Sequence, residues 1–125
     1  MIFGIGTDII EVERVAEKIT KNTGFKALVF SATEIIYCES KPNKYEHFAA
    51  RFAAKEAFFK ALGTGWINGT AFNEIEIRNT LTGKPEIYFI GKTATTIIEM
   101  KLGKISVSLS HLKTMAVAVV IIENA

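Results

Sequence analysis

A long helix with almost no polar side is the feature that most constrains this chain. Residues 51–65, RFAAKEAFFKALGTG, read as the second half of a helix that begins near Asn43 and ends at glycines. Because a helix turns by about 100° per residue, apolar side chains fall on two of its stripes: Phe48, Phe52 and Phe59 on one, and Ala50, Ala54, Ala57 and Ala61 with Phe58 on the other. A helix that is apolar on most sides is a buried helix, so the rest of the fold must cover it.

Two charged residues, Glu56 and Lys60, share the third stripe of this helix with Ala49 and Ala53. A buried carboxylate needs a partner, because burying an unpaired charge is costly. One interpretation is a structural Glu–Lys pair one turn apart, and the other is part of a functional site. The helix alone leaves both open.

Size and composition predict one globular domain over residues 1–125. Hydrophobic residues make up 49% of the chain, which argues against disorder, and a net charge of +2 gives little support for nucleic-acid binding. The single cysteine, Cys38, fits a reducing compartment and is expected in the core. No signal peptide or apolar run of about 20 residues is apparent, so we expect no membrane span and a cytoplasmic location.

Periodicity predicts an α+β fold in which the long helix packs on an antiparallel sheet. A strand over residues 1–7 ends at Asp8, which is either a helix cap or an acid of a site. The expected helices cover 11–21, a short segment from the capping box SATE to Glu39, the long helix, and 91–102 with Ala94, Ile97, Ile98 and Leu102 inward and Gly103 at its end. The later strands are expected at 74–78, 86–90, 105–111 and 115–122. The last of these is so apolar that both its faces should be covered, partly by a second subunit.

The first predicted helix carries a basic stripe formed by Arg14, Lys18 and Lys21. Such a stripe is either a solvated face or a docking face for an acidic partner helix. Phe25 follows it and is expected to pack in the core rather than act as an exposed anchor. His47 is expected at the surface.

The polar residues that could carry chemistry are Asp8, Arg51, Glu56, Lys60 and His111. Two histidines and one cysteine make a zinc site improbable, and the chain has neither a G-x-S-x-G elbow nor a complete P-loop. Two carboxylates suit Mg²⁺, which completes its shell with water and phosphate oxygens. The basic groups, together with Lys84, suit phosphates.

Several motifs occur in order: GIGTDIIEVER, RFAAKEAFFKALGTG, F-x-x-I-E-I, GKP and SLSH. Together they resemble the holo-acyl-carrier-protein synthases, the small bacterial 4′-phosphopantetheinyl transferases, over nearly the whole chain. The resemblance implies a compact α+β fold and a homotrimer with active sites between subunits. It also implies Mg²⁺-dependent transfer of phosphopantetheine from coenzyme A to a serine of an apo acyl carrier protein. The reaction releases adenosine 3′,5′-bisphosphate and serves fatty acid biosynthesis.

The same resemblance implies roles for individual residues. Asp8 and Glu56 would bind the metal, and Lys60 would contact the pyrophosphate. The chemistry adds one role: because the carrier serine must lose a proton, Glu56 is the best candidate for the general base, acting directly or through a metal-bound water. The implied coenzyme A residues are Arg51, Lys60, Gly63, Gly65, Gly83, Lys84, Pro85 and His111, with the Gly83–Pro85 turn beside the adenine. The implied carrier-protein residues are Arg14, Lys18, Lys21 and Phe25.

Two rival functions remain. A non-catalytic module could bind an acidic protein through the first helix, with Glu56 and Lys60 as a structural pair, but it would have no need for Asp8. A nucleotide hydrolase would need a Gly-rich phosphate loop, which this chain lacks.

Overall fold

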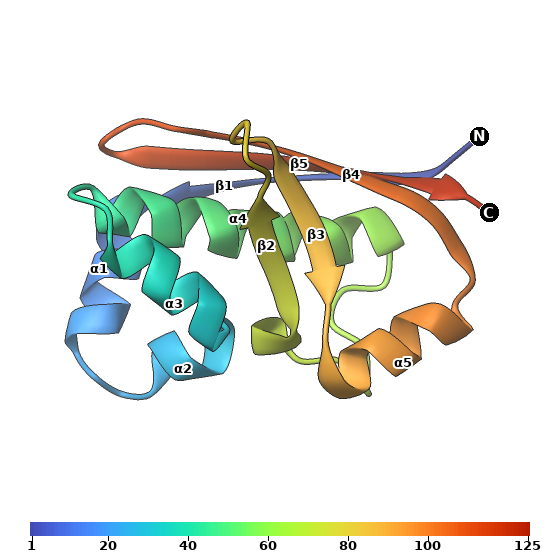
Figure 1. Cartoon of the computed structure of the whole chain (residues 1–125), viewed down its shortest axis with the longest axis horizontal. Coiled ribbons are helices and arrows are strands. Elements are labelled where there is room, and N and C mark those ends of the chain that lie inside the picture. Colours follow the sequence, from blue (N-terminus) through green and yellow to red (C-terminus); the bar gives the residue numbers. More distant parts are fainter.

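The fold is built around helix α4 (Lys44–Leu62), which lies along one face of a three-stranded antiparallel sheet (Figure 1). The computed structural model describes residues 1–125. The strand order of the sheet is β1-β5-β4, with bounds β1 (Ile2–Glu11), β5 (Met115–Asn124) and β4 (Leu102–His111). The predicted α+β fold, with a long buried helix on an antiparallel sheet, is confirmed.

The remaining elements surround α4 away from this sheet. A separate antiparallel hairpin, β2 (Ile75–Asn79) and β3 (Pro85–Phe89), crosses in front of the helix in Figure 1. Three short helices gather near the start of α4, and α5 (Gly91–Glu99) lies near its other end (Figure 1). The short helices are α1 (Val12–Thr20), α2 (Phe25–Val29) and α3 (Ala32–Glu39), and a 3₁₀ turn, η1 (Phe72–Glu74), precedes β2. No helix combines the length and apolarity needed to cross a membrane.

Small residues allow α4 to approach the sheet closely. A Cβ at Gly4 would collide with the carbonyl of Ala61, and one at Gly6 would collide with that of Ala57. Ala118 of β5 is fully buried on the same side of the sheet. Glycine at positions 4 and 6 therefore leaves room on β1 for the helix backbone.

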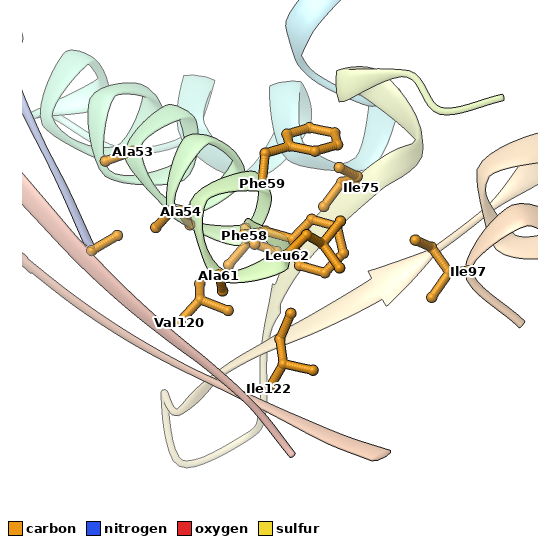
Figure 2. Packing of buried hydrophobic residues seen from close by; sticks show 13 residues of the cluster. Ala53, Ala54, Phe58, Phe59, Ala61, Leu62, Ile75, Ile97, Val120 and Ile122 are labelled. Carbon is orange, nitrogen blue, oxygen red and sulfur yellow. The ribbon is translucent and has the colours of Figure 1, made fainter. Parts of the chain in front are cut away.

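The other sides of α4 carry the larger core residues. Figure 2 shows Phe58, Phe59 and Leu62 of the helix packed with Ile75 of β2 and with further apolar side chains of the sheet and α5. The phenylalanines contact one another edge-on, with ring centroids of Phe58 and Phe59 5.5 Å apart. Burial of these rings provides the main apolar stabilisation of the fold.

Several local predictions are confirmed. Ser31 and Glu34 form the capping box at the start of α3, with both reciprocal hydrogen bonds present. Gly63 ends α4 in the left-handed conformation, with φ of 82°. Cys38 is a fully buried core residue, and burial raises the pKa of its thiol to about 12.

The prediction for Asp8 is wrong in its location. Asp8 lies inside β1, opposite Ala118 of β5, and the strand continues to Glu11. It does not cap α1, whose N-cap position is Glu11. Helix α2 was not predicted, and Asn43 at the start of α4 makes no side-chain capping bond.

The end of α5 also differs from the prediction. The helix stops at Glu99, and the chain turns at Lys101, whose φ is 54°. Gly103 therefore belongs to β4, where a Cβ would collide with the backbone of Asn124, and Leu102 is a strand residue. Ile98, which was expected to face inward, is 75% exposed.

The face of the three-stranded sheet away from α4 is partly open; it is mainly apolar along β1 and β5 and carries Ser106, Ser108 and Ser110 along β4. On β1 the exposed apolar side chains on this face are Phe3, Ile5 and Ile9. The residues opposite them on β5, such as Ile121 and Val117, are half-buried. The prediction that both faces of the last strand are covered is confirmed on the α4 side of the sheet, and cover of the other face by a second subunit stays a prediction.

Candidate active site

Asp8, Glu56 and Lys60 form the first polar cluster, between β1 and the second half of α4. Asp8 lies on the same side of β1 as Gly6, so its side chain points toward the helix. Lys60 Nζ donates a hydrogen bond to Asp8 Oδ1 at 2.8 Å. The Asp8 side chain is 15% exposed and that of Lys60 is 55% exposed, so the cluster opens to solvent on the lysine side.

The electrostatics of this cluster favour a cation. Burial, and after it the charge of Asp8, raises the pKa of Glu56 above its usual value. The hydrogen bond from Lys60 to Asp8 raises the pKa of Lys60. Glu56 forms no ion pair, so the structural Glu56–Lys60 pair, one of the two interpretations left open by the sequence, does not form: Lys60 bonds Asp8 on β1 instead. Two carboxylates with one shared lysine can accept a further positive charge.

A groove of about 510 Å³ begins at this cluster. Its polar wall is formed by Glu56 and Lys60, and its floor follows the turn after α4. The other lining residues are aromatic or glycine: Phe59, Gly63, Gly65, Trp66 and Phe72. The groove therefore joins a charged end to an apolar wall, as expected of a small-molecule site.

Arg51 and His111 lie in a second pocket of about 260 Å³. Arg51 is only 2% exposed; its Nη2 donates to Asn79 Oδ1 at 2.6 Å, and its guanidinium lies 4.3 Å from the ring centroid of Tyr37. The buried Nε of Arg51 has no hydrogen-bond partner in the chain. An unused buried donor of this kind is the expected mark of an anion site, because leaving it unpaired costs free energy.

The turn between β2 and β3 forms the rim of this second pocket. Asn79 Nδ2 donates to the carbonyl of Gly83 at 3.0 Å, which connects the turn to Arg51. Gly83 and Pro85 line the pocket, whereas Lys84 is exposed and does not. His111 Nδ1 lies 2.8 Å from Glu46 Oε1.

The two pockets lie on opposite sides of α4. Arg51 and Lys60 are nine positions apart, which turns the helix by about 180° between them. Their lining residues do not overlap. One chain thus brings Asp8, Glu56 and Lys60 together, and separately Arg51 and His111, but it does not unite the two sets.

The basic stripe on α1 is exposed as predicted. Arg14 and Lys18 border a pocket of about 400 Å³ whose apolar wall includes Ile9 and Phe52. Phe25 packs against Phe52 at 5.5 Å between ring centroids, which confirms the expectation that it contacts the core. Lys18 Nζ lies 5.4 Å from the Phe25 ring.

A buried ion pair between Lys55 and Glu34 was not predicted. Both side chains are fully buried, and Lys55 Nζ donates to Glu34 Oε1 at 2.6 Å and to the carbonyls of Val29 and Phe72. Glu34 Oε2 accepts the backbone N–H of Ile77. The sequence did carry a signal, since Lys55 falls on the same helical stripe as the buried phenylalanines. His47, expected at the surface, is half-buried and lines the second pocket. Asn79 and Tyr37 also line this pocket, and the sequence did not predict them as site residues.

A metal, if present, has one suitable set of ligands. No group of three His, Cys, Asp or Glu side chains is arranged to hold a metal ion. Asp8 and Glu56 supply two carboxylates, and Mg²⁺ usually binds one or two and takes water or phosphate oxygens for the rest. The raised pKa of Glu56 shows that a positive charge beside it would be favourable, so these residues fit Mg²⁺.

Comparison with known proteins gives a consistent family. The sequence model of the 4′-phosphopantetheinyl transferase superfamily matches residues 4–120. A holo-[acyl-carrier-protein] synthase of Cytophaga hutchinsonii is 48% identical over 125 residues, covering 97% of each chain. The crystal structure of the Neisseria meningitidis holo-[acyl-carrier-protein] synthase superposes with a TM-score of 0.90 at 32% identity, covering 99% of this chain and 100% of that one.

A further solved structure contains a ligand. It is the holo-(acyl-carrier-protein) synthase of Bacillus anthracis str. Ames in complex with CoA (3′,5′-ADP), with a TM-score of 0.81 at 35% identity, covering 100% of this chain and 99% of that one. The matches extend over both pockets and over the whole of α4. The chain therefore belongs to the 4′-phosphopantetheinyl transferase superfamily, among the holo-[acyl-carrier-protein] synthases.

Proposed function

We propose that this protein transfers the 4′-phosphopantetheine group from coenzyme A to a serine of an apo acyl carrier protein, in a Mg²⁺-dependent reaction that releases adenosine 3′,5′-bisphosphate. The observation that carries the proposal is the Asp8–Glu56–Lys60 cluster at the charged end of an open groove. The relatives are holo-[acyl-carrier-protein] synthases, and one of them binds CoA (3′,5′-ADP). The proposed setting is fatty acid biosynthesis in the cytoplasm.

Asp8 and Glu56 are the proposed magnesium ligands. When bound, Mg²⁺ would neutralise charge on the diphosphate of coenzyme A. Lys60, with its side chain 55% exposed at the groove, is placed to contact the same phosphates through its remaining N–H donors.

Glu56 is also the proposed general base for the carrier serine. A carboxylate whose pKa is raised by burial is a stronger base than one in water. Glu56 has no ion-pair partner to hold it away from a substrate hydroxyl. Its side chain forms the wall of the groove into which the serine would have to reach.

The second pocket is the proposed site for the nucleotide end of coenzyme A. The unpaired Nε of Arg51 and the imidazole of His111 can donate hydrogen bonds to phosphate oxygens. The turn at Gly83 and Pro85 is the proposed neighbour of the adenine, with the exposed Lys84 beside it. Gly63 and Gly65, in the first groove, are proposed to lie beside the rest of the ligand.

A complete site then requires a second copy of the chain. The two pockets face opposite sides of α4, so one coenzyme A molecule would contact Glu56 of one copy and Arg51 of another. The exposed side chains of Phe3, Ile5 and Ile9 offer an apolar surface for that association. We propose a homotrimer. Sedimentation should show trimers for the wild type and smaller species for Ile5→Glu, which should also lose transferase activity; a fully active monomer would contradict this arrangement.

The exposed side of α1 is the proposed docking face for the acidic carrier protein. Arg14, Lys18 and Lys21 supply the positive charge, and the Lys18 ammonium lies over the ring of Phe25. Arg14→Glu should raise KM for the carrier and reduce its dependence on salt, while kcat stays close to the wild-type value. An unchanged KM in steady-state kinetics would remove α1 from the docking surface.

The function is tested by incubating the protein with Mg²⁺, coenzyme A and an apo acyl carrier protein. Intact-mass spectrometry should show one phosphopantetheine added to the carrier, and none when Mg²⁺ is chelated. Asp8→Ala and Glu56→Ala should abolish transfer while circular dichroism remains native. If the wild type leaves the carrier unmodified, the transferase proposal is wrong and a non-catalytic binding function becomes the better explanation. Full activity in both variants would instead refute the metal assignment.

A further inference from the structure

His47 lies in the second pocket between two other rings. Its imidazole centroid is 5.0 Å from that of His111 and 5.7 Å from the ring of Tyr37, edge-on to both. It precedes Arg51 by one turn of α4, so both side chains emerge from the same side of the helix. The pocket therefore contains two imidazoles and a guanidinium within a volume of about 260 Å³.

The charges that face His47 are mostly positive. Arg51 and Lys41 lie over the Tyr37 ring, at 4.3 and 4.8 Å from its centroid. Glu46 is the one carboxylate that acts on His47, and it is already held by His111 Nδ1 at 2.8 Å. Burial first, and then His111, Arg51 and Lys41, lower the pKa of His47, so its imidazole is neutral at neutral pH.

An anion in the pocket would oppose the effect of the positive charges around His47. Arg51 offers a buried Nε without a partner, and a phosphate that accepts from it would lie in the same small pocket as the His47 ring. A phosphate dianion near an imidazole favours its protonated form. The added proton comes from solvent and is bound by the imidazole, which then becomes another cationic donor to the phosphate.

We propose that His47 is a further phosphate-binding residue of this pocket and that it takes up a proton when a phosphomonoester of the nucleotide binds beside Arg51 and His111. The inference rests on the proposed function for the identity of the ligand. It adds a specific property: the affinity for the nucleotide depends on the protonation of a residue that sequence patterns place at the surface.

The direction of the pH dependence follows from linkage. The free protein has a lowered His47 pKa, and the complex has a higher one. Binding is therefore tightest below the pKa of the free protein and weakens as the pH rises through the pKa of the complex. Each unit by which binding raises the His47 pKa corresponds to a tenfold change in affinity across that interval.

The test measures proton uptake by isothermal titration calorimetry with adenosine 3′,5′-bisphosphate as the probe. Titrations near pH 7 in two buffers with different ionisation enthalpies give the number of protons bound. His47→Phe keeps a ring against Tyr37 and His111 but cannot bind a proton, and His47→Gln serves as a second variant if the first is poorly folded. The wild type and both variants contain His111 and are titrated with the same nucleotide phosphates. The difference in proton uptake between wild type and variant therefore comes from His47.

We expect the wild type to take up more protons than either variant and to lose affinity about tenfold more than they do between pH 6 and pH 8. The titration is repeated with adenosine 5′-monophosphate, which lacks the 3′-phosphate. If the 3′-phosphate is responsible, the difference in proton uptake between wild type and variants should vanish with this ligand. Equal proton uptake in wild type and variants, with nucleotide binding and transferase activity intact, would overturn the role of His47 alone. No binding by the wild type would overturn both this role and the proposed nucleotide site.

Discussion

Two lysines in the second half of helix α4 each bond a carboxylate, and the two pairs differ in their burial and in the number of donors that remain free. Lys55 and Glu34 are fully buried, and Lys55 uses its donors on one carboxylate oxygen and two backbone carbonyls. Lys60 bonds only Asp8, and its side chain is 55% exposed. An ammonium group has three N–H donors, so Lys55 has none left for a ligand whereas Lys60 has two.

The comparison shows how a charged pair in a small fold becomes either structural or functional. The buried pair joins α2, α3, α4 and η1 at one point and fixes the second half of the long helix. The open pair lies five residues further along the same helix, beside Glu56 and the groove. We expect the first pair to help hold α4, and with it the second pair, in position.

The largest expected effect comes from breaking the buried pair. Lys55→Met leaves Glu34 charged and buried without a counter-ion, and it should lower the free energy of unfolding by about 3–5 kcal/mol. Urea denaturation at neutral pH measures this. The double variant with Glu34→Gln removes the unpaired charge and should recover part of the loss; a single variant as stable as the wild type would show that the pair is not structural.

Breaking the open pair should change activity rather than stability. Lys60→Met should alter the free energy of unfolding by less than about 1 kcal/mol, because the lysine is exposed and screened by solvent. Turnover should fall about a hundredfold if Lys60 stabilises charge that develops on the phosphates. Lys104→Met, which alters an exposed lysine on β4, is the matched control and should leave both quantities unchanged. A large loss of stability in Lys60→Met would erase the distinction between the two lysines.

The smallest expected effect concerns Glu56, the neighbour of both lysines. Its pKa is raised in the folded protein, so ionised Glu56 disfavours the native state at any pH above both the unfolded and the folded pKa. Without metal, Glu56→Gln should therefore raise Tm by a few degrees at pH 7–8, and the gain should shrink as the pH falls through the raised pKa. Thermal melts in a chelator measure this.

Magnesium sharpens the same comparison. Added Mg²⁺ should raise the Tm of the wild type but not of Glu56→Gln, because a ligand that binds only the native state stabilises it. Glu46→Gln, which alters the carboxylate bonded to His111 of the other pocket, is the control and should keep the response to Mg²⁺. A Tm of Glu56→Gln below that of the wild type at every pH would show that ionised Glu56 does not destabilise the folded protein.

Periodicity was sufficient for most of the fold, because the regular elements bury one side or one stripe of their residues. It predicted α4, both hairpins and the capping box at Ser31. It failed at Asp8, because the continuation of β1 to Glu11 depends on pairing with β5, which is a long-range contact. It also failed for α2, a helix of 5 residues that is too short to show a period.

The residues of the candidate site could be named from the sequence, but the way in which the fold arranges them could not. Spacing left open whether Glu56 and Lys60 form a local pair or part of a site, and Lys60 instead bonds a partner 52 positions away, because the sheet places Asp8 of β1 against the helix. The position of Lys55 on the helical wheel indicates that it is buried. The wheel does not identify its partners, which come from three other elements. It also contained the separation of Arg51 from Lys60 on opposite sides of the helix, and the proposal of a site shared between copies rests on that separation.

The close approach of α4 to β1 gives Gly4 and Gly6 a role that no chemical classification of residues would assign to them. A methyl group at Gly6 would meet the backbone of Ala57 and Ala61, and the helix would have to move outward. Asp8 lies two positions further along the same strand, so its reach to Lys60 would lengthen with that movement. In a mutational scan of this chain, we therefore expect substitutions at both glycines to be as harmful as those at Asp8, Glu56 and Lys60. The two glycines would act only through the spacing between β1 and α4, which sets the distance from Asp8 to Lys60.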